Sequence, residues 1–305
     1  DLQTTSARRQ VSPMSSRNGP RLGALLHTLL TTDPHLRGLQ LQLEPAAAGL
    51  DPHALGRLRA HAGQLGAIVR HDLTIPAQTL ARAAGLADPT VWVCAALGER
   101  WPGDVSELQP VPNNLSQRPS SPVPINLSQR PSLANDPTLL HRHEGAPLLR
   151  TITAAYPSPE AALRHYVELL VPPALRLCTI HGVALELHLQ NTLVVHARGR
   201  LCGFIVRDLG GVRLHRERLA AAGHDPALAP GSFILTDDLL ELQTKLAHTL
   251  FHAHLAALFA WAADLLGADE RALWAHSRAT IDAALTAWSI AHPRHAPACA
   301  ADRAV

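Results

Sequence analysis

One short segment of the chain, His181 to Thr192, concentrates side chains that can do chemistry. Apolar residues alternate there with Glu186, His188 and Gln190. Because the side chains of a β-strand point alternately to opposite faces, this pattern predicts a strand over 182–197. One face would lie in the core, and the other would present a carboxylate, an imidazole and an amide. A solvated strand face more often carries Thr, Lys or Ser, so we interpret the polar face as a candidate site.

More polar residues follow where this strand and the next one end. Asn191 closes the segment, and Arg207 and Asp208 come at the end of a second strand predicted over 201–207. Residues 198–200 are typical of a hairpin loop. The two polar ends need not be close in a hairpin, but a bulge or irregular turn at Asn191 and the next residue would bring Asp208 beside it.

These residue types suit a magnesium–nucleotide complex. Glu186 and Asp208 offer hard oxygen ligands for a magnesium ion that keeps several waters. Donors to phosphate or substrate oxygens come from His188, Gln190 and Asn191, and Arg207 adds a planar fork for phosphate or carboxylate. The alternative is structural: a polar sheet face with an Arg–Asp pair at a turn.

Composition narrows the class of protein. Of 305 residues, 47% are hydrophobic, and 27 Lys and Arg nearly balance 25 Asp and Glu. A disordered chain has few apolar residues and a large net charge, and a formal charge of +2 gives no general reason to expect nucleic-acid binding. No uncharged apolar run approaches the roughly 18 residues of a membrane span, so we expect no membrane partner and interpret 255–263 as part of a buried helix. The four Cys form no CxxC pair, which excludes a disulfide framework and favours the cytoplasm.

The periodicity predicts an α+β fold, in which an antiparallel sheet with a nucleotide-binding face is followed by a C-terminal helical bundle. Helices are predicted from Pro20, from Asp51-Pro52, from Ser158 to an interruption at Pro172-Pro173, from Asp238 to Leu266, and over 269–290. A buried strand is predicted over 91–97, and residues 65–69 fit either a strand or the end of the second helix.

A Pro-rich stretch divides the chain. Residues 101–137 hold 8 of the 24 Pro and contain the heptapeptide NLSQRPS twice, at 114–120 and 126–132. We interpret it as a linker with extended, Pro-stiffened segments, with a docking motif as the alternative. It separates residues 1–100 from 138–292, and residues 293–305 are expected to form a loose tail.

Other clusters carry weaker signals. His248 and His252 have the i,i+4 spacing of two metal ligands, but no zinc-protease carboxylate accompanies them. Residues 141–144, His-Arg-His-Glu, favour a plain loop. The short basic segment with Ser6, Arg8 and Arg9 is a weak candidate anion loop. The motifs GxxxxGK[ST] and GxGxxG are absent, and the only Lys, Lys245, falls on a predicted helix, which disfavours a kinase-type lysine site.

Five motifs carry a family resemblance. HGVALELHLQNTL at 181–193 and VRDLGG at 206–211 resemble the signature of the siderophore synthetases that work independently of peptide synthetases (NRPS-independent), of the aerobactin-synthetase type. TSAR at 5–8 and NGP at 18–20 resemble this family's S-x-R-T loop and the N-G-P after it, with Arg9 in place of the Thr. LGAIVR at 65–70 resembles a family strand that ends in Arg and Glu, with His71 in place of the Glu.

The resemblance implies a ligase that forms C–N or C–O bonds and depends on ATP and Mg²⁺. Family members adenylate a carboxylate of citrate or a citrate derivative, and a polyamine or amino alcohol then attacks the acyl-adenylate. The implied catalytic residues are His188, Gln190, Asn191 and Arg207. The implied nucleotide-binding residues are Ser6, Arg8, Arg9, Arg70, His188 and Asn191. Glu186 and Asp208 would place the metal.

Family members are considerably longer than this chain, and their upstream G-H-P-x-H-P motif is absent here. We therefore expect the C-terminal half of such an enzyme, with a partial ATP-binding region over 1–100 and a palm-like catalytic and helical domain over 138–292. Its partner would be a second copy, in a homodimer, or an upstream partner half. The alternatives are a kinase-like small-molecule phosphotransferase and a non-catalytic remnant or subunit of a split synthetase.

Overall fold

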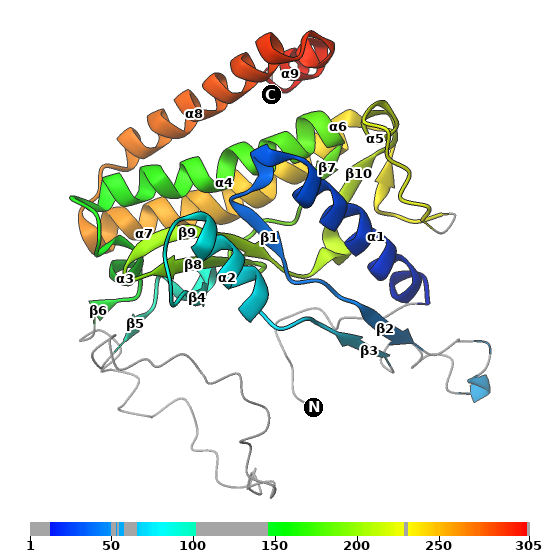
Figure 1. Ribbon diagram of the computed structural model, residues 1–305, viewed down its shortest axis with the longest axis horizontal. Helices are drawn as coiled ribbons and strands as arrows, with labels where there is room; N and C mark the ends of the chain where they lie inside the picture. The colour runs from blue at the N-terminus through cyan, green and yellow to red at the C-terminus, as the bar shows by residue number, and fades with distance from the viewer. Residues whose placement is uncertain are drawn as a thin grey trace, which may run out of the picture.

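A computed structural model of the protein describes residues 13–49, 53, 55–57, 66–101, 146–228 and 231–303 (Figure 1). The repeated heptapeptide, the cluster at 141–144, Ser6, Arg8 and Arg9 lie outside these residues, as does most of the helix predicted from Asp51. The predictions made for them stay predictions.

The largest sheet has four strands in the order β1-β9-β8-β4. Its members are β1 (Leu39–Leu41), β4 (Thr90–Val93), β8 (Thr192–Ala197) and β9 (Arg200–Val206). β8 and β9 form an antiparallel hairpin, β4 pairs antiparallel with β8, and β1 runs parallel to β9. The hairpin loop predicted at 198–200 is confirmed, because Arg198 and Gly199 both adopt positive φ, as a tight two-residue turn requires.

Helices cover both faces of this sheet. α2 (Thr74–Ala83) packs on one face through Leu80, and α4 (Pro159–His181) packs on the other through Tyr166. Every residue of β8 is buried as a result. The mixed helices and sheets confirm the α+β class. The predicted nucleotide-binding face of the sheet stays a prediction, and the strands of the β8–β9 hairpin are buried on both faces.

Two helices differ from the prediction at their prolines. α1 spans Pro13–Thr32, so Pro20 lies inside it rather than in its first turn. α4 begins as predicted, with Ser158 Oγ accepting a hydrogen bond from Ala161 N at 3.2 Å, but it continues through Pro172 and Pro173 to His181. Proline removes a helix hydrogen bond. Here α4 is buried between the sheet and α8 (Glu270–Ala291), and this packing holds it together (Figure 1).

One long helix, Leu239–Leu266, runs beside α4. It consists of α6 (Leu239–Leu246), a π-helical segment (Ala247–Leu255) and α7 (Ala256–Leu266). Asp238 caps it, as predicted, by accepting from Leu240 N at 2.9 Å. Among the described residues it is the one helix long and apolar enough to cross a membrane, but Leu242, Leu250 and Phe259 lie fully buried in the core. The prediction that 255–263 belong to a buried helix holds for these packed side chains.

The C-terminal residues are not a loose tail. A 3-10 turn (Pro293–His295) leads into α9 (Ala296–Arg303), which packs against α4 and α8. Asp302 forms a two-bond ion pair with Arg218 at 2.8 and 2.9 Å, and Cys299 is buried. The polar composition gave no sign of these long-range contacts.

The remaining elements are short. The other small sheets contain β2 (Ala46–Gly49), β3 (Gly66–Val69), β5 (Arg100–Trp101), β6 (Ala146–Pro147), β7 (Val183–Ala184), β10 (Arg213–His215) and β11 (Leu235–Thr236). Short helices are η1 (Pro34–Leu36), η3 (Cys94–Ala96), α3 (Leu149–Thr153), η9 (Leu209–Gly211) and α5 (Arg216–Ala221). Of the strand predicted over 91–97, only the first part is β4, and η3 follows it. Residues 66–69 are strand, not helix.

Candidate functional site

The segment with the predicted site residues is a loop between two strands. α4 ends at Gly182, which adopts a left-handed φ of 65°, and β7 covers only Val183–Ala184 before the chain turns through residues 185–191 into β8. The predicted continuous strand over 182–197 is therefore wrong. Its alternation is nevertheless present in burial: Leu185, Leu187 and Leu189 point into the core, while the polar residues between them reach the surface.

The backbone of this loop (185–191, the site loop) is held by hydrogen bonds at almost every residue. Leu185 O accepts from Thr249 Oγ1, and Leu187 O accepts from His254 Nδ1. His188 O accepts from Asn191 N and Thr192 N, and Leu189 O accepts from Ala95 N. Gln190 O accepts from the Arg207 guanidinium, and Asn191 O accepts from Arg207 N. A loop bonded in this way is preorganised, because its side chains start from fixed backbone positions.

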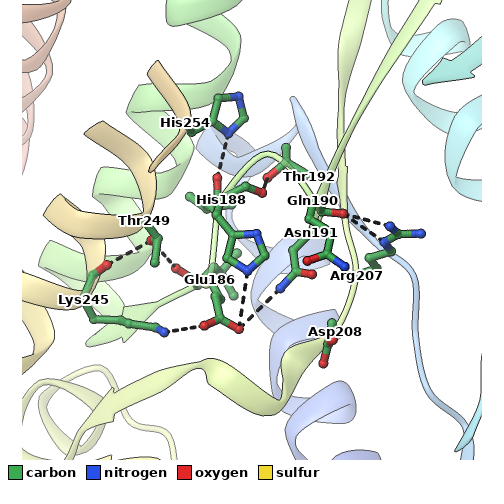
Figure 2. A network of polar contacts seen from close by, with 12 residues as sticks. Glu186, His188, Gln190, Asn191, Thr192, Arg207, Asp208, Lys245, Thr249 and His254 are labelled. Atoms are coloured by element: carbon green, nitrogen blue, oxygen red, sulfur yellow. Dashed lines mark hydrogen bonds and ion pairs between the residues drawn. The ribbon is translucent and has the colours of Figure 1, made fainter. Parts of the chain in front are cut away.

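Glu186 is the centre of the polar contacts (Figure 2). Its Oε1 accepts from Lys245 Nζ at 2.7 Å, and its Oε2 accepts from Asn191 Nδ2 at 3.3 Å and lies 4.0 Å from His188 Nε2. The backbone of Gly211 presses on this carboxylate so closely that a Cβ added to Gly211 would overlap it. Glu186 thus joins the site loop to the long helix and to η9.

Asp208 lies at the open end of the β8–β9 hairpin, beside Asn191. Thr192 pairs with Val206, and Arg207 N donates to Asn191 O at 2.9 Å, so the two polar ends meet directly. The predicted bulge at Asn191 is not needed, and the irregularity in the ladder falls between Val195 and His196 instead. Asp208 adopts a φ of 64°, which is costly for a residue other than Gly and is often found at functional positions.

Arg70 approaches Asp208 from β3. Arg70 Nη2 lies 3.9 Å from Asp208 Oδ2, and Arg70 Nε donates to Glu44 Oε1 at 3.0 Å. The family resemblance places Arg70 and Asp208 in one site, and the structure brings these two residues, distant in the sequence, close together. Arg207 instead turns to the site loop, where its guanidinium donates to Gln190 O at 2.9 and 3.1 Å.

Lys245 is a residue of the candidate site that the sequence prediction missed. Its position on a helix disfavours a kinase-type lysine, yet it donates to Glu186 from that helix. A signal was present: Lys245 and Thr249 are spaced i,i+4, so they share one face of the helix, and both contact the site loop. In contrast, His248 and His252 are exposed, with ring centroids 6.2 Å apart.

The carboxylates can be tested for their fit to Mg²⁺. This ion takes one or two carboxylates and usually completes its shell with water and phosphate oxygens. Asp208 fits that role, since its carboxylate lies at the hairpin's open end, with Arg70 Nη2 3.9 Å away. Both Glu186 oxygens already accept from protein donors, so Glu186 fits better as an anchor beside the ion. No group of three or more His, Cys, Asp or Glu suited to a metal occurs among the described residues.

Comparisons with known proteins agree along both parts of the chain. The IucA/IucC family model matches residues 1–98, and the model described as a ferric iron reductase FhuF-like transporter matches residues 163–304. The NRPS-independent siderophore synthetase rfs of Rhizopus delemar is 42% identical over 99 residues, and staphyloferrin A synthase of Staphylococcus aureus is 32% identical over 96.

Over its N-terminal third the chain is similar to NRPS-independent siderophore synthetases. The two alignments each span 32% of this chain and 16% of the relative. Among solved structures, petrobactin biosynthesis protein AsbB of Bacillus anthracis str. Sterne matches with a TM-score of 0.69 at 18% identity, over 98% of this chain and 43% of its own. Aerobactin synthetase IucC of Klebsiella pneumoniae matches with a TM-score of 0.63 at 18% identity, over 94% of this chain and 42% of its own. At such identities the likeness shows the fold alone.

The match to the FhuF-like family model raises the question of whether this chain could hold an iron cluster. Cluster irons in proteins are held mainly by Cys thiolates that face one another. In this chain the four Cys, Cys94, Cys178, Cys202 and Cys299, are buried on four different elements. Burial raises the pKa of the Cys94 and Cys178 thiols to about 12, which disfavours the thiolate that a metal needs.

Proposed function

We propose that this chain is the nucleotide-binding part of an ATP-dependent siderophore synthetase. The observation that carries the proposal is the meeting of Glu186, His188, Asn191 and Asp208 at one end of the β8–β9 hairpin, with Arg70 and Lys245 beside them. ATP-bound aerobactin synthetase IucA of Klebsiella pneumoniae has this fold, with a TM-score of 0.58 at 16% identity over 92% of this chain and 42% of its own.

The residues divide into three roles in this proposal. Asp208 would hold Mg²⁺, with Glu186 beside it, and the ion would neutralise phosphate charge. His188, Gln190 and Asn191 would line the reaction centre and bind the nucleotide. Cationic groups would neutralise the phosphates: Arg70 and Arg207 among the described residues, and Arg8 and Arg9, with the hydroxyl of Ser6, outside them. Lys245 would orient the Glu186 carboxylate through their 2.7 Å contact.

The reaction proposed is acyl-adenylate formation followed by condensation. A carboxylate oxygen of citrate or a citrate derivative attacks the α-phosphorus of ATP, and pyrophosphate leaves. A polyamine or amino alcohol then attacks the acyl carbon to form an amide or ester, and AMP leaves. Positioning and charge neutralisation supply most of the catalysis, so no covalent nucleophile from the protein is needed. We place this reaction in the cytoplasm, where ATP is available and the free cysteines stay reduced.

A titration with nucleotide tests the proposal. Calorimetry of the 305-residue chain with magnesium-ATP should show binding, and Asp208→Ala should weaken it at least tenfold. The matched control is Asp237→Ala, which removes an exposed carboxylate that pairs with Arg216 at 3.1 Å. Binding should survive in this control. A wild-type chain that fails to bind at millimolar magnesium-ATP would reject the proposal.

Turnover is a separate question, because the chain spans less than half of the solved structures it resembles. We propose that pyrophosphate release with citrate and a diamine is absent for the chain alone and is restored by adding the upstream part of a full-length synthetase. His188→Ala should then lower the rate with little loss of melting temperature, because a half-exposed side chain contributes little core area. Turnover without the upstream part would overturn the first statement, and ADP release instead of pyrophosphate would favour the kinase-like alternative.

A further inference from the structure

A buried row of polar side chains reaches the site loop from behind. His254 Nδ1 lies 2.6 Å from Leu187 O, and its Nε2 lies 2.6 Å from Tyr166 Oη, which in turn lies 3.2 Å from Cys94 Sγ. His254 and Tyr166 are both fully buried. Burying a polar group costs free energy unless the group is hydrogen-bonded. A buried row whose members are hydrogen-bonded makes the surrounding structure rigid.

The contact with Leu187 fixes the tautomer of a neutral His254. A carbonyl oxygen only accepts, so Nδ1 carries the hydrogen that reaches Leu187 O, and Nε2 of the neutral ring is left as the acceptor that faces the Tyr166 hydroxyl. Burial lowers the pKa of His254 to about 4 and raises that of Tyr166 well above its ordinary value. Both groups therefore stay neutral near pH 7, and the arrangement does not change with ordinary shifts in pH.

The π-helical segment puts His254 in reach of the loop. Lys245, Thr249 and His254 contact Glu186 Oε1, Leu185 O and Leu187 O respectively, with spacings of four and five residues along the helix. In an α-helix a residue five positions on is rotated about 140° away from the first. The i→i+5 geometry of a π-helix brings it back to the same face, and such turns are frequent at functional sites.

We propose that His254 is a positioning residue that fixes the Leu187–His188 peptide and so sets the direction of the His188 side chain. Because the Leu187 carbonyl and the His188 N–H belong to one peptide plane, the bond to His254 fixes the backbone from which His188 projects (Figure 2). The expected effect on nucleotide binding rests on the proposed function. The expected effect on the structure of the site loop is independent of it.

Two variants separate positioning from packing. The amide nitrogen of Asn is as many bonds from Cα as Nδ1, and that of Gln is as many as Nε2. His254→Asn should therefore keep a donor for Leu187 O, whereas His254→Gln should direct its amide toward Tyr166. Both leave His254's pocket imperfectly filled, so both should lower the melting temperature by similar amounts.

The first measurement is hydrogen exchange without nucleotide at Asn191 and Thr192, whose amides donate to His188 O. His254→Gln should speed exchange about three- to tenfold, the worth of one hydrogen bond, and His254→Asn should recover most of the protection. Equal exchange in the two variants, or wild-type exchange in His254→Gln, would overturn the proposal. If neither variant folds, Tyr166→Phe keeps the ring packed on Phe204 and removes the hydroxyl that contacts His254 Nε2 and Cys94 Sγ, and it should give the same faster exchange.

The second measurement is magnesium-ATP affinity, which should fall by a similar factor in His254→Gln and be largely restored in His254→Asn. If wild-type protein binds no nucleotide while the exchange contrast persists, the proposed function fails and the positioning role stands. If nucleotide binds and both variants lose it equally, the positioning role fails and the proposed function stands.

Discussion

At the scale of single residues, Glu186 depends on a glycine. Gly211 lies against the Glu186 carboxylate, and a side chain at this position would occupy the same space. The carboxylate needs its present place, because there it accepts from Lys245 and Asn191 together. Backbone approach of this kind is a common reason for glycine next to a polar site.

We predict that Gly211→Ala displaces the Glu186 carboxylate and weakens magnesium-ATP binding about tenfold. Loss of one ion pair and one amide contact in a partly buried site is enough for that change. Calorimetry measures the affinity, and a melting curve reports folding. Gly210→Ala is the matched control, because its added Cβ would meet Asp208 Oδ1 at 3.7 Å, an ordinary contact. Equal losses in the two variants would show that the Glu186 contact does not matter.

The sequence predicted which side chains of the site loop are buried and which reach the surface, but it predicted the wrong secondary structure for the loop. Alternation from Leu185 to Gln190 correctly separated core from surface, but an extended loop produces the same alternation as a paired strand. Contacts of Arg70 and Lys245 with the site join residues far apart in the chain, and no local pattern carries that information. The roles assigned to all these residues remain predictions.

At the scale of elements, α9 is attached by one buried ion pair. Arg218 donates to both Asp302 carboxylate oxygens and also to Cys178 O, and the Asp302 side chain is only 5% exposed. Gln243 adds a further donor to Asp302 at 2.7 Å. Through these bonds α9 is joined to α4, α5 and α6.

We predict that Asp302→Ala destabilises the protein by about 3–5 kcal/mol, because it leaves the Arg218 guanidinium buried without its carboxylate. Urea unfolding followed by circular dichroism measures the change. The exposed pair of Arg216 with Asp237, at 3.1 Å, provides the comparison, and Asp237→Ala should cost less than about 1 kcal/mol. A loss for Asp302→Ala as small as this would mean that α9 is not held by the pair.

Helix ends were predictable where local chemistry sets them. The side chains of Ser158, Asp238 and Asp269 each accept from the first turn, as the sequence indicated. Pro172 and Pro173 misled the prediction, because propensity treats them as breakers while the tertiary packing of α4 offsets their cost. The same reason, contacts distant in sequence, explains the missed α9.

At the scale of the whole molecule, the site depends on both sides of the Pro-rich stretch. β1 and β4, from the N-terminal part, flank the β8–β9 hairpin, and Asp33 contacts Arg176 and His181 of α4. Because helices cover both faces of the sheet, the strand ends are where its polar groups can reach a ligand. This explains why the candidate site lies at the hairpin's open end.

Two buried histidines should make the stability of the whole molecule depend on pH. Burial lowers the pKa of His196 and of His254 to about 4, from an ordinary value of 6.5. His196 accepts from Trp92 Nε1 at 3.0 Å in the sheet, so it too is held neutral. Between pH 6.5 and about 4 the unfolded chain binds protons that the folded chain does not, and stability therefore falls as pH falls through this window.

We predict that the free energy of unfolding decreases by about 2 kcal/mol for each of these histidines between pH 7 and pH 5. Urea unfolding at the two pH values measures it. His196→Gln should remove about half of this difference, because glutamine does not titrate, although the variant starts from a lower stability. Asp33 does not contribute in this range: burial opposes its ionisation, but hydrogen bonds from His181 and Arg176 hold its pKa well below 3.8, so its stabilisation is lost only in stronger acid. A pH dependence that is unchanged in His196→Gln would show that His196 is protonated, or able to be protonated at little cost, inside the folded protein.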